Sequence, residues 1–74
     1  MRTGLFWLDD KVNSDLNSSI SRAAAYYLRK YGAHPDLCFV HPSLLGGKTP
    51  RFEGILILPN RSLRPNQLWI GAQE

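Results

Sequence analysis

One amphipathic helix and four short apolar segments set the strongest constraint on what this chain can fold into. Residues 15–31 (DLNSSISRAAAYYLRKY) repeat apolar side chains at helical spacing, whereas LFWL, LCFV, ILIL and LWI have the length and composition of strands. A single helix covers only one face of a sheet. The sequence therefore predicts a small α+β domain whose second sheet face is left open to a partner.

The expected helix has one apolar stripe and marked ends. We expect Asn13 or Ser14 to cap the first turn, with Asp15 complementing the positive end of the helix dipole. Gly32 supplies a left-handed stop. Tyr26 falls at the margin of the stripe and is expected at the surface. The stripe that should face the core comprises Leu16, Ile20, Ala23, Ala24, Tyr27, Leu28 and Tyr31.

The expected strands are bounded by Gly, Pro, Asn or Asp, as strands commonly are. LCFV and ILIL are continuously apolar, which is typical of central strands buried on both faces. Residues 43–53 are expected to form a loop. The element order is β, α, β, β, β, which predicts a single domain over residues 1–74 with one helix packed on one face of a four-stranded mixed sheet. The four strands are Leu5–Leu8, Leu37–His41, Gly54–Leu58 and Leu68–Gly71.

A strand, helix and strand in succession usually form a right-handed crossover with the two strands parallel, and the later strands can then follow as antiparallel neighbours. This arrangement predicts two sheet ends of different charge. The end that holds the helix N-terminus gathers an acidic to mixed set, namely Asp9, Asp10, Asn13, Ser14 and His41, with Lys48, Arg51 and Glu53 nearby. The opposite end gathers a basic set, namely Arg2, Arg29, Lys30, His34, Arg61 and Arg64, opposed chiefly by Asp36.

Charge and cysteine content narrow the class of protein. The 74-residue chain carries a formal net charge of +3, a mild excess that is compatible with contact to nucleic acid or an acidic surface. Its one cysteine, Cys38, can form no intrachain disulfide, which favours a reducing, cytoplasmic compartment. The apolar run near the N-terminus is too short for a signal peptide or a membrane helix, so no membrane partner is expected.

Two groups of polar residues have the composition of metal sites. His34, Cys38 and His41 lie within eight positions, but residues three apart on a strand point to opposite faces, so Cys38 and His41 should diverge. We therefore expect no zinc site, and we interpret Cys38 as a small buried apolar side chain.

Asp9 and Asp10 follow the first strand, where carboxylates could hold Mg²⁺ for phosphodiester cleavage with His41 or Glu53 assisting. The same residues also form an ordinary polar turn into a capped helix, which is the interpretation we favour. No catalytic residue, metal ligand or cofactor is assigned, and the chain is expected not to be an enzyme.

Part of the chain resembles a group of short uncharacterised bacterial proteins. The resemblance is carried by a Tyr-Tyr helix, a Lys-Tyr-Gly stop, the strand P-x-x-C-x-V-x-P at residues 35–42, and the closing segment L-W-I-G at residues 68–71. It implies a small bacterial domain, and it carries no activity and no functional residue with it.

Three functions remain open from the sequence. The first is a small non-enzymatic interaction module that self-associates through the uncovered sheet face and forms a homodimer. The second is a nucleic-acid-binding protein that uses the basic edge. The third, which the sequence supports least, is a Mg²⁺-dependent phosphodiesterase at Asp9 and Asp10. The nucleic-acid-binding residues expected for the second are Arg29, Lys30, Arg61 and Arg64.

Overall fold

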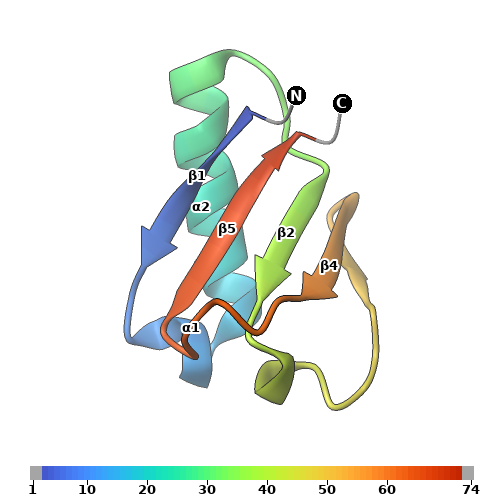
Figure 1. Ribbon diagram of the computed structural model, residues 1–74. Coiled ribbons are helices and arrows are strands. Elements are labelled where there is room, and N and C mark those ends of the chain that lie inside the picture. Colours follow the sequence, from blue (N-terminus) through green and yellow to red (C-terminus); the bar gives the residue numbers. More distant parts are fainter. Residues whose placement is uncertain (1–2, 73–74) are drawn as a thin grey trace.

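The computed structural model describes residues 3–72, and within them five strands form one mixed sheet with a long helix packed behind it (Figure 1). The strand order across the sheet is β1, β5, β2, β4, β3. This arrangement confirms the α+β class and the single main helix, and it adds a fifth strand that was not predicted. The elements are β1 Thr3–Leu8, α1 Lys11–Ser14, α2 Leu16–Tyr31, β2 Leu37–Val40, the 3-10 helix η1 Pro42–Leu44, β3 Arg51–Phe52, β4 Ile55–Pro59 and β5 Gln67–Ala72.

The last strand lies inside the sheet. β5 pairs antiparallel with both β1 and β2, so these two strands run parallel to each other with β5 between them. That orientation is the one expected for a strand-helix-strand crossover. β4 departs from expectation because it pairs with β2 in parallel. The loop after β4, residues 60–66, therefore lies at the sheet end where β2 finishes. There the Asn60 amide donates to the Val40 carbonyl at 2.8 Å, and the Asp9 amide donates to the Asn66 carbonyl at 3.0 Å.

The extra strand arises from a tight turn within the segment that was expected to be a loop. Glu53 (φ 53°) and Gly54 (φ 80°) both occupy the left-handed region, which is the conformation that a two-residue hairpin requires. The turn lets Phe52 pair with Ile55, so part of the expected loop becomes β3. β3 stops after two residues and forms one edge of the sheet.

Helix α2 begins one residue later than expected, and its cap is a different residue. Asp15 is the N-cap, and its carboxylate accepts the Ser18 amide at 3.3 Å, whereas Asn13 and Ser14 belong to the short helix α1. Gly32 ends the helix in the left-handed conformation (φ 73°), as expected. No helix within residues 3–72 combines the length and apolar character needed to cross a bilayer.

The core lies between α2 and one face of the sheet. Its central helix positions agree with the predicted stripe, since Ile20, Ala23 and Tyr27 are buried. The stripe ends early, because Leu28 and Tyr31 keep 36% and 40% of their surface exposed. The burial of these apolar side chains is the main stabilising contribution to the fold. The buried cluster comprises Val12, Ile20, Ala23, Tyr27, Cys38, Val40, Leu45, Ile55, Ile57, Leu68 and Ile70.

Candidate binding surface on the open sheet face

The sheet face opposite α2 carries a row of aromatic side chains. Side chains alternate between the two faces of a strand, and residues that pair across strands share a face. Phe6 pairs with Trp69, Trp69 pairs with Phe39, and Phe39 pairs with Leu58. The aromatic row therefore crosses three adjacent strands, β1, β5 and β2, and Leu58 continues the apolar surface onto β4. We call this surface the open face, and within residues 3–72 its strand positions are Gly4, Phe6, Leu8, Leu37, Phe39, Arg51, Leu56, Leu58, Gln67, Trp69 and Gly71.

Among the apolar side chains of the open face, those on β1 are the most exposed, and Leu37 on β2 is buried. Phe6 and Leu8 expose 71% and 69% of their surface, whereas Phe39 and Trp69 are half-buried. The rings of Phe39 and Trp69 lie 5.7 Å apart at an angle of 49°. Such tilted contacts hold aromatic rings in place while leaving part of each ring accessible. The expectation of an apolar sheet face without a covering helix is confirmed.

Gly4 determines where the Trp69 ring lies. A Cβ atom at position 4 would come within 2.1 Å of Cζ2 and 2.5 Å of Cε2 of Trp69. The indole therefore lies over the backbone of β1, in the space that any other residue would fill. Glycine at this position allows a large ring to pack diagonally onto the neighbouring strand.

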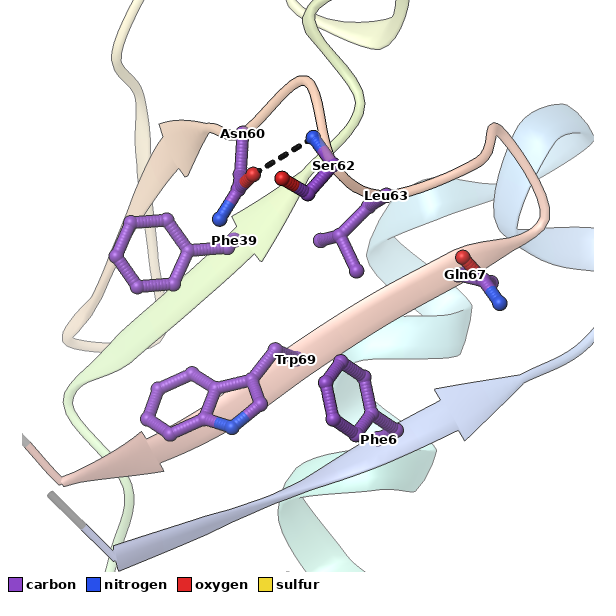
Figure 2. Close-up of a pocket in the computed structure, with 7 residues that line it drawn as sticks. All are labelled: Phe6, Phe39, Asn60, Ser62, Leu63, Gln67 and Trp69. Carbon is purple, nitrogen blue, oxygen red and sulfur yellow. Dashed lines mark hydrogen bonds between the residues drawn. The ribbon is translucent and has the colours of Figure 1, made fainter.

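A pocket of about 580 Å³ opens between this aromatic row and the loop 60–66 (Figure 2). Leu63 is buried although it lies outside the helix-side core, and it projects from the loop over the open face (Figure 2). Asn60 Oδ1 accepts the Ser62 amide at 2.8 Å. At the other end of the loop, Gln67 Oε1 accepts the Arg64 amide at 2.9 Å. These bonds fix the loop and leave the side-chain NH₂ groups of Asn60 and Gln67 at the rim of the pocket.

Of the basic residues expected to form one edge, Arg2 lies outside the described residues, and the four proposed to bind nucleic acid lie at opposite ends of the sheet. Arg29 and Lys30 belong to the last turn of α2, at the end where β2 begins. Arg61 and Arg64 lie in the loop after β4, at the end where β2 finishes. The prediction of a single basic edge was wrong, because it assumed that β4 runs antiparallel to β2. Arg61 and Arg64 are instead exposed on the loop that borders the aromatic pocket.

The acidic turn after β1 is already engaged within the chain. Asp9 Oδ2 accepts from the Arg22 guanidinium at 2.9 Å, and Asp9 Oδ1 accepts the Lys11 amide at 2.9 Å. The Lys11 amide and, after it, the Arg22 guanidinium hold the pKa of Asp9 below its ordinary value. Glu53 lies at the opposite sheet end, in the hairpin before β4. Residues 3–72 contain no group of three or more His, Cys, Asp or Glu side chains placed to bind a metal ion.

The three residues of the candidate zinc cluster lie apart along strand β2, with Cys38 within the strand and one histidine beyond each of its ends. Cys38 is buried against α2, and burial raises the pKa of its thiol to about 12. His41 follows β2, where its Nδ1 accepts the Ser43 amide at 3.1 Å and so caps η1. His34 lies before β2, at the other end of that strand, and is exposed. The expected divergence of Cys38 and His41 agrees with this geometry.

The alignment of Phe6, Phe39 and Trp69 on one sheet face was not predicted from the sequence. Alternation divides the residues of each strand between two faces, but it shows that Phe6, Phe39 and Trp69 share a face only once the pairing of the strands is known. Comparison with protein-family models, curated proteins and solved structures finds no match for this chain. The open face and its bordering loop are therefore interpreted from their own geometry.

Proposed function

We propose that this protein binds single-stranded nucleic acid across its open face. The observation that supports the proposal is the row formed by Phe6, Trp69 and Phe39 on three adjacent strands. Exposed rings on a sheet form a platform on which unstacked bases pack, and each such contact contributes about 1–3 kcal/mol. Duplex DNA, whose bases are stacked inside, would present no ring faces to this row.

The charges around the row suit a polyanion better than they suit a second copy of the same face. Arg61 and Arg64 are exposed on the loop whose residues Asn60, Ser62 and Leu63 line the pocket. Arg51 shares a face with Leu56 on the strand pair at the far edge. Within residues 3–72, no strand position of the open face carries a carboxylate. Two open faces packed together would bring arginines toward arginines and would bury the amide groups at the rim of the pocket.

The rim of the pocket adds a second kind of contact. Asn60 and Gln67 each use the side-chain oxygen within the loop, so their NH₂ groups remain as donors beside the rings. Such donors can bond base carbonyls or phosphate oxygens of a strand lying on the row. The loop therefore contributes polar contacts and positive charge next to the stacking surface.

Fluorescence anisotropy with labelled single-stranded DNA and RNA oligonucleotides tests this function. Phe39→Ala should weaken binding by roughly 5-fold to 150-fold, the equivalent of one lost stacking contact. In the wild-type background, Arg61→Ala combined with Arg64→Ala should also weaken binding. The slope of log K, the binding constant, against log salt concentration should fall in magnitude by about 1.4, or 0.7 for each phosphate contact.

The matched control removes two cations from the other end of the sheet. Arg29→Ala combined with Lys30→Ala changes the net charge equally, and it should leave both the stacking contribution and most of the salt slope in place. An equal loss of oligonucleotide affinity in the two double variants would show that net charge alone attracts the ligand, and it would refute the proposed surface. Absence of binding together with self-association that Phe39→Ser abolishes would identify the open face as a protein interface instead.

A further inference from the structure

Strand β1 forms an edge of the sheet and presents an unpaired row of backbone groups. The Asp9 amide bonds to the Asn66 carbonyl, and this bond continues the ladder between β1 and β5. Hydrogen bonding alternates along an antiparallel strand. Trp7 and Leu5 therefore share the orientation of Asp9, with N–H and C=O groups toward β5. The outward N–H and C=O groups belong to Gly4, Phe6 and Leu8, and within residues 3–72 no strand lies beyond them.

This edge lacks the features that usually prevent pairing. Natural edge strands are kept short or carry charges, prolines or bulges. β3, at the other edge, has two residues, one of which is Arg51. β1 has six residues, TGLFWL, with no charged residue and no proline. Its two most exposed large side chains, Phe6 and Leu8, lie next to the unpaired backbone groups.

We propose that β1 pairs antiparallel with β1 of a second copy, so that the two sheets join edge to edge across a twofold axis. In the proposed register Phe6 faces Phe6 of the second copy, and Gly4 faces Leu8. This register pairs all three outward-facing residues within the strand, whereas a shift of two residues in either direction leaves one of them without an outward partner in β1. It also sets the smallest residue of the edge opposite the branched side chain of Leu8.

A second copy suits this edge better than a polyanion does. Between residues 3 and 8 the strand carries no charge, and the carboxylate of the next residue, Asp9, is already paired with Arg22. Two copies would therefore meet without opposing like charges, while a nucleic-acid backbone would find no cation on the strand. The edge pairs through backbone N–H and C=O groups, whereas the open face offers aromatic rings, and Phe6 and Leu8 belong to both.

The size of the contact sets its strength. Two Phe6 and two Leu8 side chains have on the order of 500 Å² of exposed surface to bury, taking roughly 200 Å² as the full area of each side chain. This is well below the roughly 1,600 Å² of a standard interface, even before the backbone is counted. The dimer is accordingly expected at micromolar concentrations and above rather than at nanomolar ones.

Pairing at β1 would also extend the aromatic row. Phe6 is the last member of the row in one copy, and in the proposed register it faces its own counterpart. The rings of both copies then lie on one continuous sheet face. A single-stranded ligand would find twice as many stacking positions as on one copy, although the pairing itself depends on no ligand.

Cysteine cross-linking tests the register. In a hydrogen-bonded antiparallel pair the two Cα atoms lie about 5.5 Å apart, a separation that disulfides span. Phe6→Cys should therefore give a covalent dimer under mild oxidation. Leu8→Cys is the matched control, because position 8 is equally exposed but would lie roughly 13 Å from its counterpart, beyond disulfide reach. The native Cys38 is buried and does not compete.

A backbone variant separates edge pairing from packing of two faces. Leu8→Pro removes an outward N–H that β5 does not use, whereas Leu8→Ala removes the side chain and keeps the N–H. Sedimentation should show at least a 10-fold weaker dimer for Leu8→Pro than for Leu8→Ala, with circular dichroism confirming that both fold. Any of three results would overturn the proposed pairing. These are equal dimerisation of the two variants, equal cross-linking at positions 6 and 8, and a wild-type protein that is still a monomer at about 100 μM. The comparison of Phe39→Ala with wild type in the oligonucleotide assay tests the proposed function separately, because Phe39 lies on β2 and not on the paired edge.

Discussion

Substitution of Gly4 should displace the Trp69 ring and destabilise the protein. The added Cβ would approach Cζ2 of Trp69 to 2.1 Å, where van der Waals contact between carbon atoms requires at least about 3.5 Å. The ring must therefore move by more than 1 Å or the strand must shift, and overpacking of this kind costs about 1–3 kcal/mol. For a domain of this size, Gly4→Ala should lower the melting temperature by roughly 4–20 °C.

A double-variant cycle isolates the contact. In a Trp69→Ala background the ring is gone, so Gly4→Ala should cost at least about 1 kcal/mol less than in the wild-type background. Part of the cost should persist, because the Cβ would also lie 2.8 Å from the Ile70 carbonyl oxygen. Urea unfolding followed by circular dichroism gives the four free energies. If Gly4→Ala costs the same in both backgrounds, the indole does not lie over Gly4 and the described open face is incorrect.

Three further predictions concern the ends and the core of the fold. Because burial raises the pKa of Cys38 from 9.0 to about 12, the unfolded chain loses this proton first as pH rises. The free energy of unfolding should therefore fall above pH 9 by about 1.4 kcal/mol per pH unit. Urea titrations at several pH values should show a smaller fall for Cys38→Ala, and an equal dependence on pH in the two proteins would contradict this role of Cys38. Asp15→Ala should cost about 1 kcal/mol, because its carboxylate caps α2 through the Ser18 amide, and an unchanged melting temperature would refute that role. The pKa of Asp9 is lower in the folded protein than its ordinary value of 3.8. The ionised carboxylate therefore stabilises the fold above pH 3.8, and this contribution is lost as the pH falls through the pKa of Asp9 in the folded protein. Asp9→Asn should flatten this acid limb in melts between about pH 2 and 5, and an identical limb would exclude the contribution.

The sequence alone was sufficient for the local structure. Helix α2 has an apolar period, a basic last turn and a glycine stop, and all three act within a few residues of chain. The four main strands were found for the same reason, since short apolar runs bounded by turn residues are a local signal. The count of one helix against four strands also predicted the uncovered sheet face. Boundaries and the capping residue were less accurate, because neighbouring residues compete for the same terminal amides.

Strand order and direction were decided by tertiary structure. Nothing in the segment ILIL specifies that β4 runs parallel to β2, yet that direction moves Arg61 and Arg64 to the end of the sheet opposite Arg29 and Lys30. The insertion of β5 between β1 and β2 likewise brings Trp69 between Phe6 and Phe39. These pairings join residues at least 19 positions apart, and they depend on how the whole core packs. The amino-acid sequence determined that one sheet face would stay uncovered. Strand pairing determined that three aromatic rings would align on that face and that the loop carrying Arg61 and Arg64 would border it.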